Sequence, residues 1–217
     1  MKTRFAALGL AVAGLFWLAP AALADPIGPG DWTPDSPDHD VQTCVGGTVD
    51  GTTFSLPGGN SATVGPMDAC DNGEPRAEFR YKNYAGDGEN YSTGIRQFEG
   101  TFTINSMGGD RLALKQTFNG DNGPYFIMAV ENTGRLYSVE GGATIDASVA
   151  QVGSAVQVNT VHDTGSNKFQ VYLNGSLAYE DDNAPGGDFY DKVGAYTTSS
   201  GSGDINVTWN NIQFWHQ

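Results

Sequence analysis

The sequence predicts an all-β protein, a single domain built as a β-jelly roll sandwich of two antiparallel sheets. Three observations support this prediction. About ten short segments carry β-branched or aromatic residues at alternate positions, as half-buried strands do. Clusters of Gly, Asn and Asp separate these segments. No helical period extends beyond about two turns, so two packed sheets are the way in which this chain can bury its apolar residues.

The expected strands cover most of the chain after residue 75. They span residues 76–84, 97–105, 111–118, 125–131, 135–141, 155–163, 168–175, 176–181, 191–198 and 205–216. Asn174-Gly175 is a strong signal for a two-residue hairpin turn, because both residue types tolerate positive φ. A four-residue turn ending in Gly134 separates two other segments, and the 30 glycines suit a chain with many tight turns.

The first residues have the pattern of a secretory signal peptide. Lys2 and Arg4 give a positive start, an apolar run follows from Phe5, and small residues up to Ala24 form a cleavage site. We therefore expect residues 1–24 to be removed and the mature protein to be secreted and extracellular.

The rest of the chain divides into a leader and one domain. Residues 25–40 are rich in proline and aspartate and have no apolar period, so we expect an extended leader there and the jelly roll over residues 41–217. The mature chain would keep nine basic residues against 25 acidic ones. Such a surface repels nucleic acid and anionic membranes, so neither is an expected partner. We expect a monomer.

The two cysteines, Cys44 and Cys70, predict one disulfide. They lie 26 positions apart in a chain that carries an export signal. Closing a loop of this length stabilises a protein by roughly 3 kcal/mol. No histidine lies nearby at the spacing of a metal site, and we expect no metal at the functional site.

Several familiar catalytic patterns are missing. The chain has no H-E-x-x-H, G-x-S-x-G or G-x-x-x-x-G-K-[ST] motif. Glu74 and Glu78 are close in sequence, but Pro75 interrupts the strand between them. Glycoside hydrolysis by two carboxylates is therefore disfavoured.

The segment 76–80 places charged residues on one face of a strand. Arg76, Glu78 and Arg80 alternate, and the intervening residues form an apolar face that we expect to be core. A carboxylate between two guanidinium groups would fix their orientation. The alternative is an ordinary surface ladder of charges.

Two further segments add polar groups to strand faces. Gln116 and Lys115 are expected on opposite faces of their strand. Gln116 shares its face with apolar residues, where a buried amide needs a hydrogen-bond partner. Tyr190, Lys192 and Tyr196 share a face in the segment 190–198. A structural amide and packed tyrosines are the alternatives. Together with the arginines, however, these side chains predict one cleft on a concave sheet.

The same three segments resemble motifs of a known enzyme family. Arg76-Ala-Glu78-Phe-Arg80 is similar to the R-[ST]-E-[LV]-R motif of the alginate lyases in polysaccharide lyase family 7. The stretch from Tyr190 to Tyr196, YDKVGAY, resembles that family's Y-F-K-A-G-V-Y, and Gln116 falls in the place of its Q-[IV]-H strand. The glucuronan lyases of the related family 20 have a similar jelly roll. The resemblance implies a concanavalin A-like fold and β-elimination on an acidic, uronate-containing polysaccharide.

The resemblance also implies roles for the matched residues. Arg76 (or Arg80) and Gln116 would neutralise the substrate carboxylate, and Tyr196 would deliver a proton to the leaving oxygen. Arg80 and Lys192 would bind substrate carboxylates. The remaining candidates for substrate binding, on the same three segments, are Glu78, Tyr190 and Lys115.

One position departs from the family pattern. Phe118 stands where the Q-[IV]-H strand has its histidine. His162, on a different expected strand, is then the possible base, although a lone histidine is more often structural. If no histidine reaches the site, either Tyr196 serves as both base and acid on glucuronan or a mannuronate polymer, or the protein is a non-catalytic, lectin-like carbohydrate-binding protein.

The chemistry implied by the resemblance requires no cofactor. Two acidic loops, at residues 118–123 and 179–188, carry oxygen ligands of the kind that Ca²⁺ takes, and a structural Ca²⁺ is an open alternative there. Neither loop follows the 12-residue calcium pattern.

Overall fold

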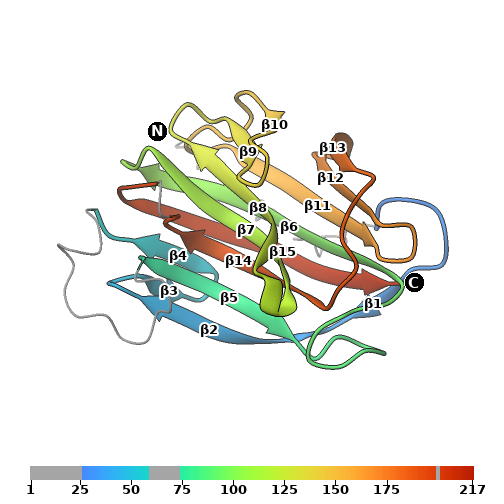
Figure 1. Cartoon of the computed structure of the whole chain (residues 1–217). Helices are drawn as coiled ribbons and strands as arrows, with labels where there is room; N and C mark the ends of the chain where they lie inside the picture. The colour runs from blue at the N-terminus through green and yellow to red at the C-terminus, as the bar shows by residue number, and fades with distance from the viewer. Residues whose placement is uncertain (1–25, 59–73, 199–200) are drawn as a thin grey trace, which may run out of the picture.

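Two antiparallel β-sheets pack face to face in the computed structural model, which describes residues 26–58, 74–198 and 201–217 (Figure 1). The expected signal peptide and Cys70 lie outside the described residues. Within them, no helix is long and apolar enough to cross a membrane. The two packed antiparallel sheets confirm the predicted all-β sandwich.

The first sheet has eight strands, in the order β13-β12-β11-β6-β15-β4-β3, with β1 paired to β15. Its strands are β1 (Thr33–Asp35), β3 (Thr48–Asp50), β4 (Thr53–Leu56), β6 (Ile95–Met107), β11 (Ala155–Asp163), β12 (Lys168–Leu173), β13 (Ser176–Asp181) and β15 (Ile205–His216). Asn174 and Gly175, both at positive φ, form the predicted hairpin turn between β12 and β13.

The second sheet has seven strands, in the order β10-β9-β8-β7-β14-β5-β2. Its strands are β2 (Asp38–Cys44), β5 (Arg76–Lys82), β7 (Arg111–Asn119), β8 (Pro124–Glu131), β9 (Leu136–Ser138), β10 (Thr144–Asp146) and β14 (Phe189–Tyr196). A short 3-10 helix, η1 (Gly120–Asn122), follows β7. The three segments singled out in the sequence are β5, β7 and β14, which are neighbours in this sheet.

Aromatic side chains from both sheets fill the space between them. Phe54 on β4 contacts Phe79 on β5 edge to face, with ring centroids 4.9 Å apart, and Trp209 on β15 is fully buried. Ala77 and Tyr81 belong to the same core as Phe79. The alternation predicted for residues 76–81 is therefore confirmed on its apolar side.

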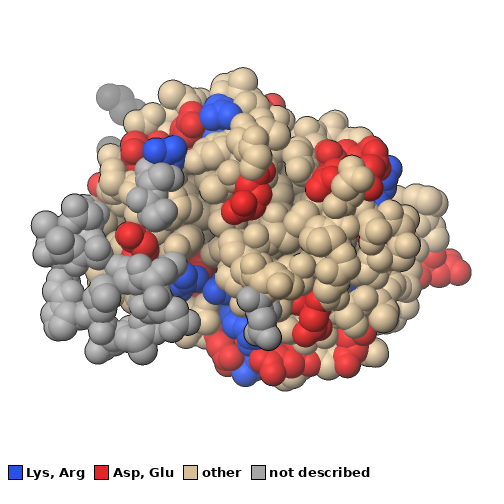
Figure 2. All heavy atoms as spheres, viewed as in Figure 1, with Lys and Arg blue, Asp and Glu red and all other residues tan. Residues whose placement is uncertain are grey.

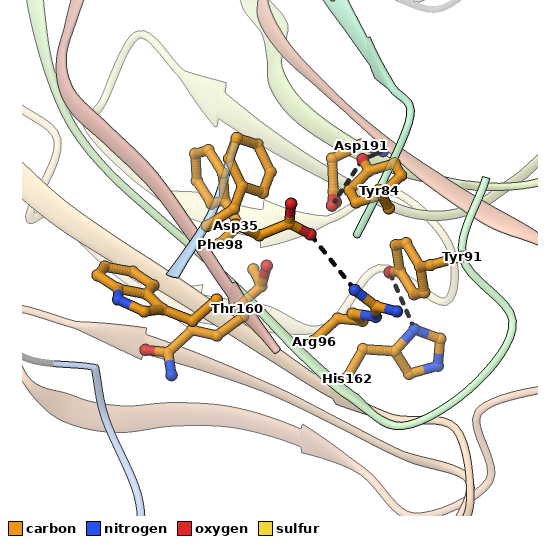
Figure 3. A pocket seen from close by; sticks show the side chains of 11 residues that line it. Asp35, Tyr84, Tyr91, Arg96, Phe98, Thr160, His162 and Asp191 are labelled. Carbon is orange, nitrogen blue, oxygen red and sulfur yellow. Dashed lines mark hydrogen bonds and ion pairs between the residues drawn. The ribbon is translucent and has the colours of Figure 1, made fainter. Parts of the chain in front are cut away.

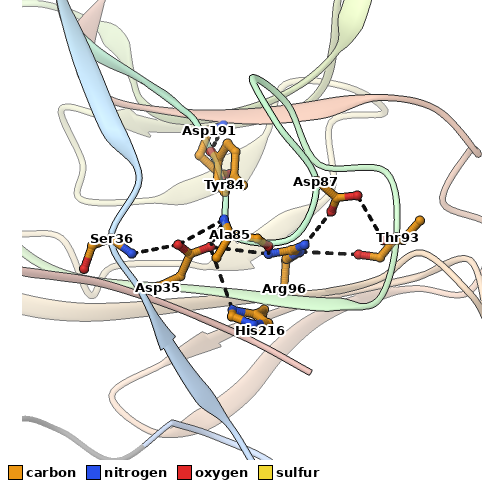
Figure 4. A network of polar contacts seen from close by, with 9 residues as sticks. All are labelled: Asp35, Ser36, Tyr84, Ala85, Asp87, Thr93, Arg96, Asp191 and His216. Carbon is orange, nitrogen blue, oxygen red and sulfur yellow. Dashed lines mark hydrogen bonds and ion pairs between the residues drawn. The ribbon is translucent and has the colours of Figure 1, made fainter.

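The segment expected to be a leader contributes strands to the domain. β1 pairs with the end of β15, and β2 pairs with β5 along its whole length. The buried Asp35 carboxylate accepts hydrogen bonds from the Ala85 amide and from Arg96, whose guanidinium also pairs with Asp87 (Figure 4). The boundary at residue 40 is thus wrong. The segment has no apolar period because β2 is an edge strand and β1 is short.

Cys44 is the last residue of β2 and is not a free thiol. Because Cys70 lies outside the described residues, the pairing of these two cysteines stays a prediction.

Candidate active site

Three neighbouring strands bring the polar segments onto one face of the second sheet. β14 lies between β5 and β7, and Lys192 is paired with Arg80 on one side and with Gln116 on the other. Tyr196 is paired with Arg76 by the same register. We call this surface the cationic face; its residues are Arg76, Glu78, Arg80, Gln116, Phe118, Tyr190, Lys192 and Tyr196.

Positive charge is concentrated there although the protein as a whole is acidic. In Figure 2 several Lys and Arg atoms form a short diagonal group below the centre of the viewed face, in the region of β14 and β5 in Figure 1. The complete chain has only 11 basic residues and a net charge of −14. A local cluster of cations can attract an anionic ligand to one place even on an acidic protein.

Glu78 is the centre of the hydrogen-bond network on this face. Its side chain is 1% exposed, and its two oxygens accept hydrogen bonds from Arg76 Nη1 and Gln116 Nε2, each at 2.5 Å. Gly194 is the residue of β14 that is paired with Glu78. The hydrogen bond from Gln116 on β7 to Glu78 on β5 therefore spans β14, which lies between these two strands. The predicted role of the carboxylate, to orient donors, agrees with this geometry.

Tyr196 lies on the cationic face and not in the main core. It packs in a separate small cluster with Ala113 and Ile127 and is 8% exposed. The Arg76 guanidinium carbon lies 4.3 Å from the centroid of the tyrosine ring. Tyr196, Arg76, Glu78 and Gln116 therefore form one continuous chain of contacts.

Aromatic rings and cations stack at the other end of the face. Tyr190 stacks on Phe118 with centroids 5.2 Å apart, and the Arg80 guanidinium carbon lies 4.3 Å from the Tyr190 centroid. Lys192 Nζ lies 4.9 Å from the Phe118 centroid. Burial raises the pKa of the Tyr190 phenol, and the hydrogen bond and charge of Arg80 oppose this rise. Such a platform can bind the apolar face and the carboxylate of a sugar acid.

Several solved structures of alginate lyases are similar to this chain. Alginate lyase AlgAT5 from polysaccharide lyase family 7 is 21% identical, with a TM-score of 0.60 over 76% of this chain and 77% of that one. Alginate lyase AlyA1 from Zobellia galactanivorans is 16% identical, with a TM-score of 0.60 over 86% and 95%. Alginate lyase PA1167 from Pseudomonas aeruginosa is 20% identical, with a TM-score of 0.57 over 76% and 82%. No family model and no curated protein matches the sequence.

This chain has the alginate lyase jelly-roll fold. The predicted resemblance is thereby confirmed for the fold, and identities this low show no more than that.

Lys115 lies on the core side of the second sheet, away from the cationic face, and so is not placed to bind substrate. Its ammonium group is fully buried and pairs with Asp191 Oδ1 at 2.6 Å, and it also donates to Thr117 Oγ1. A register shift between Ala113 and Lys115 turns the lysine toward the core. Burial lowers the pKa of Lys115, and Asp191 opposes the shift.

His162 is not placed to act as the base. It lies on β11 in the other sheet, where its Nδ1 is 3.1 Å from the Tyr91 hydroxyl (Figure 3). Burial lowers the pKa of His162 to about 4. The adjoining cavity has a volume of about 10 Å³, room for one water molecule and not for a sugar ring. The structural alternative for this histidine agrees with the geometry.

Two residues that contact the cationic face were missed in the sequence. Arg80 pairs with Glu89 at 3.0 Å and donates to Asn90 Oδ1 at 3.4 Å, both from the loop after β5. These loop residues belong to no motif, and no sequence pattern indicated their role. Among the described residues no group of three or more His, Cys, Asp or Glu side chains could hold a metal ion.

Proposed function

We propose that this protein is a secreted polysaccharide lyase that cleaves a glucuronan or mannuronate-type polymer by β-elimination. The observation that carries the proposal is the contact chain from Gln116 through Glu78 and Arg76 to Tyr196. It combines donors for a carboxylate with a phenol that can transfer a proton. The alginate lyase fold supports the same reaction class.

Arg76 and Gln116 would act on the substrate carboxylate. Removing the C5 proton of a uronate creates negative charge on the adjacent carboxylate, in an enolate-like intermediate. A guanidinium and an amide held in place by Glu78 stabilise that charge without reorganising during the reaction. Arg80 and Lys192 supply further positive charge for neighbouring uronate units.

Tyr196 would transfer the proton. Its phenolate oxygen takes the proton from C5, the C4–O4 bond breaks as the C4=C5 double bond forms, and the phenol returns the proton to O4. The Arg76 guanidinium beside the ring stabilises negative charge on the tyrosine. One residue can do both steps only when the C5 proton and O4 lie on the same face of the sugar, as in glucuronate and mannuronate.

Phe118 supports this choice of substrate. It occupies the position at which the family pattern has a histidine, and it stacks on Tyr190. No histidine belongs to the cationic face, and His162 is held in the other sheet. Guluronate, in which the proton and O4 lie on opposite faces, would require a second base.

A non-catalytic, lectin-like carbohydrate-binding protein is the second candidate. The absence of a histidine from the cationic face favours it, because the same side chains can bind a polyanion without reacting. Incubation with a panel of uronate polymers separates the two candidates. A lyase produces a new conjugated double bond that absorbs in the ultraviolet, and a binding protein retains the polymer in a pull-down without that signal.

The remaining properties that we propose follow from the sequence. The protein is exported by its signal peptide, acts as a monomer without a required cofactor, and has a Cys44–Cys70 disulfide. Thiol titration of the denatured, unreduced protein should find no reactive thiol.

A further inference from the structure

A polar pocket opens beyond the Tyr190 end of the cationic face. It has a volume of about 450 Å³ and is lined by Asn90, Asn119, Gly120, Asn122, Gly187 and Asp188. Pockets that hold small organic ligands have volumes of about 300–1,000 Å³. The size is therefore suitable for a sugar unit.

The chain makes this pocket continuous with the cationic face. Asn119 directly follows Phe118, and Asp188 lies two residues before Tyr190, so both come from the ends of the strands that carry the aromatic stack. Asn90 links the two regions, because its oxygen accepts from Arg80 and its nitrogen donates to Asp188 at 3.0 Å. A polymer lying along the face would continue into the pocket.

The lining groups suit hydroxyls and not carboxylates. The pocket offers three side-chain amides, the backbone at two glycines and one carboxylate, with no lysine or arginine among its lining residues. A uronate in this place would bring its carboxylate close to Asp188, and two like charges repel. Neutral sugar hydroxyls can donate to Asp188 and pair with the amides.

We propose that this pocket is a subsite for an uncharged sugar unit, so that a uronate polymer with a neutral sugar at this place binds more tightly than one made of uronates alone. The inference rests on the proposed function, since it extends the binding path of that polymer. Asp188 then selects by repulsion as well as by hydrogen bonding.

The pocket is far from the bond that breaks. Tyr190 and Tyr196 are six residues apart on β14, which is about 20 Å at about 3.3 Å per residue. Several sugar units therefore separate the pocket from Tyr196. Changes in the pocket should alter KM and leave kcat nearly unchanged.

Binding measurements with the Tyr196→Phe variant, which should leave polymers intact, test the inference. The ligands are glucuronan, a polymer in which glucuronate alternates with a neutral hexose, and a neutral β-1,4-linked glucose tetramer, all with a chelator present. Asn122→Ala removes one pocket amide, and Asn132→Ala, in the β8–β9 turn, is its control. Asp188→Asn removes the pocket charge, and Glu140→Gln is its control.

Asn122→Ala should weaken binding of the alternating polymer and of the tetramer about fivefold or more, and should change glucuronan binding less than twofold. Asp188→Asn should strengthen glucuronan binding more than Glu140→Gln does. Equal effects on all ligands, or no effect, would overturn the inference. So would a pocket response to Ca²⁺ alone after the chelator is removed. If neither uronate polymer binds, the proposed function fails, and binding of the tetramer still decides the pocket.

Discussion

Gln116 and Glu78 lie on strands that are not neighbours, yet Gln116 Nε2 donates to Glu78 Oε1 at 2.5 Å across β14. Gly194, on β14 between these two strands, has no room for a side chain. It has a φ of +142°, and a Cβ atom there would lie 2.3 Å from the carbonyl oxygen of Ala77. The glycine in the sequence YDKVGAY is thus required by close packing and by its backbone conformation.

Glu78→Gln should lower kcat/KM by about 10- to 150-fold. The change keeps the shape of the side chain and removes the charge that orients Arg76 and Gln116; hydrogen bonds to charged groups contribute about 1.5–3 kcal/mol. Initial rates of double-bond formation check the effect. Glu89→Gln, on an exposed side chain beside Arg80, is the control and should have a smaller effect. An unchanged rate for Glu78→Gln would show that the network has no part in catalysis.

The stereochemistry of the substrate should decide the rate. Glucuronan and polymannuronate present the C5 proton and O4 on the same face, which one tyrosine can serve, whereas polyguluronate does not. We expect initial rates on polyguluronate at least tenfold below the better of the other two. Equal or faster cleavage of polyguluronate would mean that a second base exists.

His162→Phe should leave kcat/KM within about threefold of the native value at pH 7. The histidine packs among aromatic rings in the first sheet and touches none of the residues of the cationic face. Loss of turnover in a folded His162→Phe variant would restore His162 as the base.

The same variant should change how stability depends on pH. The pKa of His162 is lowered to about 4 in the folded protein, from 6.5, so its contribution to stability is complete above pH 6.5 and is lost as pH falls toward 4. The loss amounts to roughly 3 kcal/mol. Urea unfolding at several pH values should show a shallower decline between pH 6.5 and 4 for His162→Phe. Parallel curves for both proteins would contradict the assignment.

Lys115 and Lys192 should give opposite results when each is changed to Met. Lys115→Met leaves the Asp191 carboxylate buried without its cation, and breaking such a pair costs about 3–5 kcal/mol of stability. Lys192→Met should weaken polymer binding and change stability little. Urea unfolding and affinity measurements on both variants check this contrast. A Lys115→Met protein with native stability and weakened polymer binding would return Lys115 to the substrate site.

Regular alternation was the part of the structure that the sequence predicted well. It placed Phe79 in the core and Glu78 between two arginines on the opposite face, because β5 has no irregularity. It failed at Lys115, since the register shift in β7 turns that side chain inward and nothing in the letters RLALKQTF marks such a shift. It also could not assign His162, because the sequence does not tell which sheet a strand joins.

The most direct test of the account compares turnover and binding for native protein and Tyr196→Phe on glucuronan. The phenylalanine ring keeps the packing against Arg76 and removes the hydroxyl that transfers the proton. We expect double-bond formation by the native protein, a loss of at least about 10³-fold in the variant, and dissociation constants that agree within threefold. A variant with more than a tenth of the native rate would contradict the role of Tyr196. A native protein that binds uronate polymers and yields no double bond would contradict the lyase proposal itself.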